Sequence, residues 1–197
     1  MRRIAVILLV LLCMVQGALA STGEGGKEPS PPPEGAALPE MKLPVPPKLE
    51  QRDYLGIKEG EYFKVSDTKA DVVIIEVFSM YCPFCQKEAP NVNALQGLIA
   101  KRPELIGRIK FIGIGAGNST YEVHAFRNLY GISFPLVPDV NFTFHKALGE
   151  VRTPCFIVVR LGPDKSNKII YSRVGSFGDP QQFLDLILQR SGLDKGK

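Results

Sequence analysis

The stretch VVIIEVFSMYCPFCQKEAP, residues 72–90, decides the fold of this chain. Its first seven residues, from Val72 to Phe78, are almost all β-branched or aromatic, a pattern typical of a central strand that is buried on both faces. A helical pattern begins within the Cys-x-x-Cys pair formed by Cys82 and Cys85. We therefore expect the pair where a strand passes directly into the N-terminus of a helix.

Cys82 is the candidate nucleophile of this pair. Free backbone N–H groups and the helix dipole favour a negative charge at a helix N-terminus, which lowers the pKa of a thiol from its free value of about 8.5. Cys85 follows one helical turn later, where it can attack a mixed disulfide at Cys82 and release the partner. A structural zinc site is the alternative, but no second Cys-x-x-Cys or His-x-His pair follows. The pattern favours redox chemistry and predicts no metal site and no cofactor.

The first 20 residues form a separate segment. They contain two arginines, an apolar run over residues 4–15 and an Ala-Leu-Ala ending, which predicts a secretory signal peptide cleaved before Ser21. The run is short for a membrane span, and an uncleaved N-terminal anchor is the alternative. Export brings the chain into an oxidising compartment and predicts an extracytoplasmic, periplasmic location.

Composition divides the remaining chain into a linker and one domain. Residues 21–49 hold eight of the sixteen prolines and no aromatic residue, which predicts a disordered linker. Residues 50–197 are enough for a single domain. The net charge is +4, and removal of the two arginines of the signal segment leaves +2. A charge so close to neutral gives no support to nucleic acid as a partner.

The order of the expected elements predicts the fold class. Before the Cys-x-x-Cys motif, residues 54–57 and 61–65 suggest a small N-terminal hairpin. After it we expect a helix over 83–101, a strand over 109–116, a helix from the Ser119/Glu122 capping box to Gly131, a strand over 134–137, a helix over 142–148, strands over 155–160 and 168–174, and a helix between Asp179 and Gly192. Such an order predicts an α/β fold with a central mixed sheet flanked by helices.

Two motifs carry a resemblance to a known family. With Cys82-Pro83-Phe84-Cys85 after one strand and Arg152-Thr153-Pro154 just before another, the chain resembles proteins with the thioredoxin fold. The pattern Cys82-x-x-Cys85-x-x-Glu88-x-Pro90 and the stretch 130–137 are similar to exported thiol-disulfide oxidoreductases of the TlpA and ResA type. This resemblance implies a strand and helix inserted before a cis-proline, over 118–148.

The resemblance also implies roles for individual residues. Cys82 is then the attacking thiol, Cys85 the resolving thiol, and Pro154 the cis-proline that helps to hold a partner's backbone beside Thr153. Pro83 and Phe84 lie between the two cysteines and complete the expected substrate-binding set. Proteins of the TlpA and ResA type usually have a second proline before the resolving cysteine, and this chain has Phe84 there. The pair Pro83-Phe84 resembles that of glutaredoxins, and a proline at the position of Pro83 also occurs in the DsbA oxidants. The peroxiredoxin signature Pro-x-x-x-Thr-x-x-Cys is absent around Cys82.

For function, the resemblance implies exchange of disulfides with cysteine-containing exported proteins. The expected direction is reduction, for example in cytochrome c or copper-site maturation, with a membrane redox partner that regenerates the pair. Two alternatives stay open at this point. One is an oxidant like DsbA, because the residues between the cysteines tune the reduction potential. The other is a thioredoxin-fold carrier that binds a metal or a client.

Two further residues are candidates near this site. Glu76 stands six residues before Cys82, where thioredoxins carry a buried aspartate. A carboxyl group in an apolar strand is expected to have a raised pKa and to accept the proton of Cys85, although pairing with a lysine is the alternative. Cys155 follows Pro154 and is expected to be a small buried hydrophobic residue, with a third redox thiol as the alternative.

Overall fold

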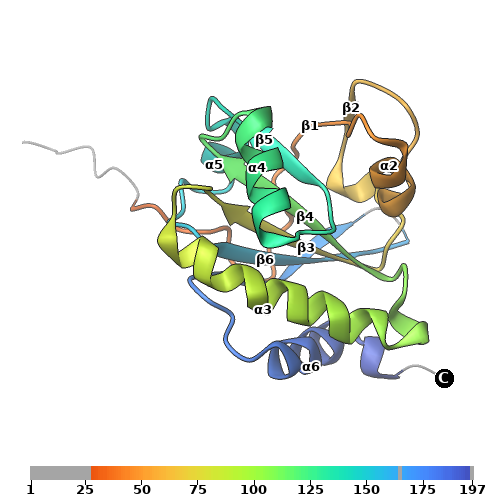
Figure 1. Cartoon of the computed structure of the whole chain (residues 1–197). Helices are drawn as coiled ribbons and strands as arrows, with labels where there is room; N and C mark the ends of the chain where they lie inside the picture. Colours follow the sequence, from red (N-terminus) through yellow and green to blue (C-terminus); the bar gives the residue numbers. More distant parts are fainter. Residues whose placement is uncertain (1–27, 164–165, 196–197) are drawn as a thin grey trace, which may run out of the picture.

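The computed structural model describes residues 28–163 and 166–195 (Figure 1). Its centre is a five-stranded sheet with the order β5-β4-β3-β6-β7. The strands are β3 (Val72–Phe78), β4 (Ile109–Ala116), β5 (Leu136–Asp139), β6 (Cys155–Leu161) and β7 (Asn167–Val174). β3 pairs in parallel with β4 and antiparallel with β6, so the sheet is mixed. The expected thioredoxin-like arrangement is confirmed.

The helices are α2 (Leu49–Leu55), α3 (Pro83–Ala100), α4 (Thr120–Tyr130), α5 (Thr143–Ala147) and α6 (Pro180–Ser191). Single 3-10 turns occur at Val65–Asp67, Pro103–Leu105 and Leu193–Lys195. Helices α3 and α6 lie side by side against one face of the sheet (Figure 1). No helix among the described residues is long and apolar enough to cross a membrane.

Local capping signals place the helix ends where the sequence predicts them. The Ser119 side chain accepts a hydrogen bond from the Glu122 N–H, and α4 ends at Gly131 in a left-handed conformation. Asp179 caps α6 in the same way, and a left-handed Gly192 ends it. These ends match because a cap depends on contacts within a single turn.

Strand β3 divides the core into two layers. All seven of its residues are buried, and their side chains alternate between the two faces of the sheet. Ile74 and Phe78 pack with α3 and α6, whereas Ile75 and Val77 pack with the N-terminal segment. Glu76 follows the alternation of Ile74 and Phe78 and therefore faces the helical layer that contains the cysteines.

Residues 28–49 do not form the expected disordered linker. Leu38, Met41 and Leu43 are buried in the core on the second face of the sheet, and Ala37 forms a β-bridge with Lys168. The proline-rich composition misled the prediction because three apolar side chains suffice to attach this segment to a face that α3 and α6 leave uncovered. Residues 21–27 and the expected signal segment 1–20 lie outside the described residues.

The N-terminal strand pair is present, but one of its strands differs from the prediction. Strand β1 (Leu43–Pro44) pairs antiparallel with β2 (Tyr62–Phe63), which lies inside the expected 61–65 strand. The other expected strand, 54–57, is wrong, because Tyr54 and Leu55 belong to the last turn of α2. Gly56, at φ 70°, closes α2 with its N–H directed to carbonyl oxygens of the last turn.

The inserted strand and helix before β6 are also present. Strand β5 begins at Leu136 rather than at the expected Phe134. Its ladder with β4 starts where the Gly113 N–H bonds the Pro135 carbonyl oxygen at 3.0 Å. Pro135 has no N–H to donate, so pairing cannot extend further back along the strand. Phe134 instead packs in the core.

Candidate active site

The turn between β3 and α3 holds Cys82 in a fixed position. The Cys82 N–H donates to the Ser79 carbonyl oxygen at 3.0 Å, and Gln86 Nε2 donates to the Met80 carbonyl oxygen at 2.9 Å. The Met80 N–H donates to Asn118 Oδ1 at 2.9 Å. Asn118 is fully buried at the end of β4, so the neighbouring strand supports this turn. No local pattern predicts this role of Asn118, because the contact joins two distant segments.

Cys82 is the N-cap residue of α3, and its side chain makes no capping hydrogen bond. Its Sγ lies 3.2 Å from the Thr153 carbonyl oxygen. Partial burial raises the pKa of the Cys82 thiol, but hydrogen bonds from the Thr153 side chain, from Cys85 and from the Phe84 backbone outweigh it and leave the pKa below its ordinary value. A thiolate at Cys82 is therefore stabilised by the site, in the direction expected for a helix N-terminus.

Cys85 has the opposite environment. Its side chain is fully buried in the core between the sheet and α3. Burial is the main cause that raises the pKa of the Cys85 thiol well above its ordinary value, and the nearby charge of Glu76 contributes in the same direction. The motif thus combines an accessible thiol that ionises readily with a buried thiol that stays protonated.

Glu76 is a buried carboxyl group behind Cys85. Only 1% of its surface is exposed, and burial followed by the charge of Glu88 raises its pKa to about 8. Its Oε1 has no hydrogen-bond partner among the described residues. No ion pair with a lysine is found for Glu76 within residues 28–163 and 166–195, so the paired-carboxylate alternative has no support there.

A second buried carboxyl group, Glu88, lies close enough to Glu76 to raise the pKa of that residue. It is 3% exposed and lies three residues after Cys85, on the same face of α3. One oxygen accepts a hydrogen bond from the Phe177 N–H at 3.3 Å, and the other accepts one from Asn91 Nδ2 at 3.3 Å. The Cys-x-x-Cys-x-x-Glu spacing was the signal that could have revealed it, since residues three apart share a helix face.

The expected substrate-binding residues lie on two sides of Cys82. On the helix side, Pro83 occupies the first position of α3 and Phe84 is 69% exposed. On the other side, the Thr153-Pro154 peptide bond is cis, as expected, and the buried Pro154 directly precedes β6. Cys82 is therefore flanked by an exposed aromatic ring and by the backbone of Thr153.

Cys155 lies apart from this pair. It is fully buried at the start of β6 and packs in the core on the opposite face of the sheet from Cys85. Burial raises the pKa of its thiol to about 12. The structure thus shows the small buried residue that was expected. In the part of the chain that the structure describes, no group of three His, Cys, Asp or Glu side chains could hold a metal ion.

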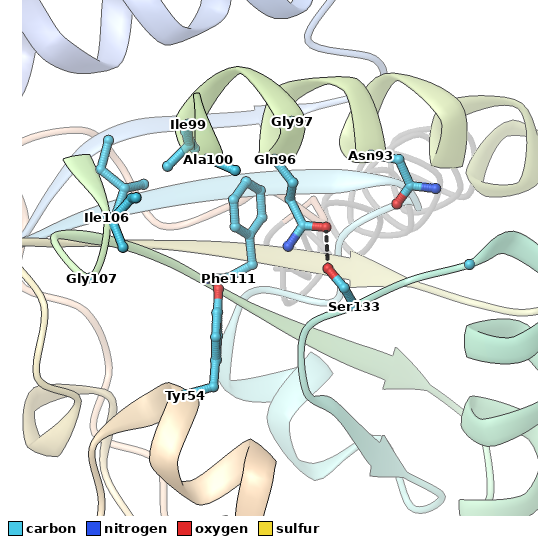
Figure 2. Close-up of a pocket in the computed structure, with 12 residues that line it drawn as sticks. Tyr54, Asn93, Gln96, Gly97, Ile99, Ala100, Ile106, Gly107, Phe111 and Ser133 are labelled. Carbon is cyan, nitrogen blue, oxygen red and sulfur yellow. Dashed lines mark hydrogen bonds between the residues drawn. The ribbon is translucent and has the colours of Figure 1, made fainter. Parts of the chain in front are cut away.

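Two cavities flank helix α3. A groove of about 500 Å³ adjoins the Cys82 turn and is lined by Ser79, Tyr81, Ala116, Gly117, Phe142, His145, Val151, Arg152 and Thr153. A cavity of about 570 Å³ lies at the other end of the helix, where Gln96 and Ser133 meet across its wall (Figure 2). Only the first cavity contacts the residues around the nucleophile.

Known proteins that the chain resembles are named for thiol-disulfide exchange. A family model described as the AhpC/TSA family matches residues 35–172. The chain belongs to the AhpC/TSA family. Two curated relatives are named thiol-disulfide oxidoreductase ResA. The protein from Halalkalibacterium halodurans is 24% identical over 131 residues, which cover 66% of this chain and 69% of that protein. The protein from Bacillus subtilis is 26% identical over 136 residues, which cover 68% of this chain and 65% of that protein.

Solved structures support the fold of this AhpC/TSA-family chain. A structure from Chlorobium tepidum, described as a thiol:disulfide interchange protein DsbE, superposes with a TM-score of 0.60 at 17% identity and covers 81% of this chain and 99% of its own. StoA from Bacillus subtilis superposes with a TM-score of 0.53 at 17% identity, and the match covers 77% of this chain and 98% of StoA. Both the thioredoxin-like fold and the expected likeness to ResA-type proteins are confirmed.

Proposed function

We propose that this AhpC/TSA-family chain is an exported thiol-disulfide oxidoreductase that exchanges a Cys82-Cys85 disulfide with cysteines of extracytoplasmic proteins. The observation that carries the proposal is the pair of thiols with opposite pKa shifts at the start of α3. One thiol is accessible to a partner, and the other is buried beside an acid without a hydrogen-bond partner on Oε1. The names of the curated relatives support the same activity.

In the reductive direction, the first step is attack on a disulfide of the client protein. The Cys82 thiolate forms a bond to one client sulfur, and the client S–S bond breaks. The departing client sulfur leaves as a thiolate and takes a proton from solvent. In this proposal Thr153 and Pro154 on one side and Pro83 and Phe84 on the other hold the client during this step; the closeness of Thr153 to Cys82 and the position of Pro83 at the start of α3 support it.

The second step resolves the mixed disulfide. Cys85 gives its proton to the Glu76 carboxylate, and its sulfur attacks the Cys82 sulfur. The bond between Cys82 and the client breaks, and the Cys82-Cys85 disulfide forms. The second client sulfur leaves as a thiolate and takes a proton from solvent, so the client is released as a dithiol. Two electrons have then passed to the client. A buried base is needed because burial holds Cys85 in its protonated form. A dithiol donor in the membrane would return the two electrons.

One observation favours the opposite direction of electron flow. The lowered pKa of Cys82 stabilises the reduced form of the pair, and a stabilised reduced form makes a disulfide more oxidising. The second candidate is therefore an oxidant like DsbA. Equilibration of the protein with glutathione buffers decides between them, because a potential near that of DsbA assigns an oxidant and one near that of thioredoxin assigns a reductant.

The proposal is tested by trapping partners on Cys82. In a Cys85→Ser variant the mixed disulfide cannot be resolved, so client proteins remain bound to Cys82 and are released by dithiothreitol. A Cys82→Ser/Cys85→Ser variant is the matched control and should trap none. Absence of thiol-sensitive adducts in the single variant, together with failure to reduce insulin by the unmodified protein, would contradict the exchange function. Stoichiometric copper binding in that case would favour the carrier.

A further inference from the structure

The groove beside Cys82 has two aromatic walls and a charged rim. We call it the Arg152 groove, and it is formed by the nine residues, from Ser79 to Thr153, that line the 500 Å³ space next to the cis-proline turn. Helix α5 and the start of α3 lie at the same end of the sheet, so the inserted segment borders the nucleophile (Figure 1). Neither the two-step exchange nor its proton transfer uses Phe142, Tyr81 or Arg152.

Phe142 forms one wall and is held in an unusual conformation. It has a left-handed backbone at φ 58°, which is uncommon for a bulky residue. Its ring packs directly against Gly117. The Cβ of any other residue at position 117 would lie 2.5 Å from the Phe142 Cζ, so the ring fills the space that a side chain would need. The ring also meets His145 edge to face at 5.6 Å. These contacts fix the ring, yet 43% of the residue remains exposed to the groove and to solvent.

Tyr81 forms the other aromatic wall. Its hydroxyl donates a hydrogen bond to the Glu122 carboxylate, and that carboxylate also accepts the Ser119 N–H of the α4 capping box. The side chain is therefore fixed at its tip, although 68% of the residue is exposed. An exposed ring that is held in place loses little side-chain entropy on binding. The two walls thus present apolar surface to a chain that approaches Cys82.

Arg152 supplies a positive charge at the rim of the groove. It is exposed and comes directly before Thr153, whose carbonyl oxygen lies 3.2 Å from the Cys82 Sγ. Its guanidinium makes no hydrogen bond or ion pair with any residue that the structure describes. The Glu122 carboxylate accepts hydrogen bonds from Tyr81 and Ser119, and neither Glu122 nor Glu150 lines the groove. Arg152 is therefore free to bind a carboxylate of another molecule.

We propose that the Arg152 groove selects client segments that carry an acidic side chain and a large apolar side chain within two residues of the exchanging cysteine. An extended client advances about 3.3 Å per residue, so these neighbours reach Arg152 and the two rings while the client sulfur meets Cys82. The charge favours the acidic residue, and the rings cover the apolar one. This inference rests on the proposed exchange at Cys82, and it adds the class of client.

The test uses short peptides whose single cysteine carries a thiopyridine group. The Cys82 thiolate attacks the peptide sulfur, the mixed disulfide with the peptide forms, and the thiopyridine leaves as a chromophore. Three peptides differ only in the residue next to cysteine, which is Asp, Asn or Lys. The readout is the ratio of the second-order rate constants for the Asp and Lys peptides at low salt. Dithiodipyridine, a small neutral disulfide, reports the intrinsic reactivity of Cys82.

We expect the unmodified protein to react about tenfold faster with the Asp peptide than with the Lys peptide, since one contact changes from attraction to repulsion. Arg152→Glu should invert the ratio, and Arg152→Gln, a milder change, should bring it near one. Arg160→Glu is the matched control, because Arg160 is exposed at the other end of β6 and borders a different cavity. It should leave the ratio unchanged.

Phe142→Ala tests the aromatic wall with a second peptide pair, in which leucine or glycine stands near the cysteine. The preference for leucine should fall about fivefold when the ring is removed. The inference would be overturned if the ratio of the Asp and Lys rate constants were near one in the unmodified protein, or if the Arg152 variants had the same ratio as the unmodified protein. If dithiodipyridine still reacts at Cys82, the exchange function stands without this selectivity. If dithiodipyridine does not react at Cys82, the exchange function itself is wrong.

Discussion

The two ends of helix α3 both border a cavity and both bury an ionisable group, yet only one end has the chemistry of an active site. At the start of the helix, burial raises the pKa of Glu76 to about 8. At the other end, burial raises the pKa of Tyr54 to about 12 (Figure 2). A perturbed pKa therefore does not by itself distinguish the two ends.

The difference lies in what each buried group can do. Glu76 has an oxygen without a partner and acts electrostatically on the thiol of Cys85. The Tyr54 hydroxyl accepts the Phe111 N–H at 2.8 Å and so has a structural partner on the edge of β4. The helix also has a direction. Its N-terminus presents N–H groups that stabilise a thiolate, whereas its C-terminus presents carbonyl oxygens that disfavour an anion.

The largest effect is expected from the nucleophile. Cys82→Ser should lower the rate of insulin reduction by more than about a thousandfold, because no other described thiol is both accessible and readily ionised. Cys155→Ser is the matched control and should retain nearly full activity, since Cys155 is buried in the core on the other face of the sheet. An inactive Cys155→Ser variant with an unchanged circular dichroism spectrum would assign this thiol to the site after all.

The next effect concerns the buried acid. Glu76→Gln should slow resolution of the mixed disulfide by about a hundredfold, because the proton of Cys85 loses its acceptor. The measurement is stopped-flow release of a peptide from Cys82. Alkylation of Cys82 by iodoacetamide should proceed at the unmodified rate, which separates proton transfer from a general loss of structure. Unchanged release would show that Glu76 is only a buried structural acid.

The pH dependence of resolution gives a smaller change. Glu76 accepts a proton only as the carboxylate, and its pKa is about 8. Below that pH the carboxylate fraction falls about tenfold per pH unit, so the resolution rate should rise with pH and level off above 8. In Glu76→Gln this levelling should disappear. A flat profile between pH 6 and about 8 in the unmodified protein would contradict the assignment.

The smallest effect is expected at the far end of α3. Tyr54→Phe removes the acceptor of the Phe111 N–H and should lower the free energy of unfolding by about 1 kcal/mol in urea titrations. Disulfide exchange should not change, because this end of the helix has no thiol. If Tyr54→Phe lost disulfide exchange while remaining fully folded, the two ends of α3 would be coupled, and the contrast drawn between them would be wrong.

Prediction from sequence succeeded where the signal is local. The expected strand over 109–116 coincides with β4, and the caps at Ser119 and Asp179 begin α4 and α6 as expected. It failed for residues 28–49, where the prolines indicated a linker. Those residues are ordered by contacts of Leu38 and Leu43 with a distant sheet, and a composition signal cannot include such contacts.

The candidate site was foreseen in part. The Cys-x-x-Cys spacing, the acid at position 76 and the proline at 154 were recognised, whereas Glu88, Asn118 and Arg152 were given no role. Glu88 could have been found from its helical spacing to Cys85. Asn118 could not, because the hydrogen bond that brings it to the site joins segments 38 residues apart.

The sequence by itself determined that one thiol begins a helix and that a second thiol follows one turn later, because a strand, a turn and a cap are specified by neighbouring residues. Only the tertiary structure decided which groups surround them. The approach of Thr153 to Cys82 and the burial of Glu76 beside Glu88 depend on packing between distant elements. Desolvation shifts a pKa only when the whole fold excludes water, so the acid–base properties of the site belong to the folded domain and not to the motif.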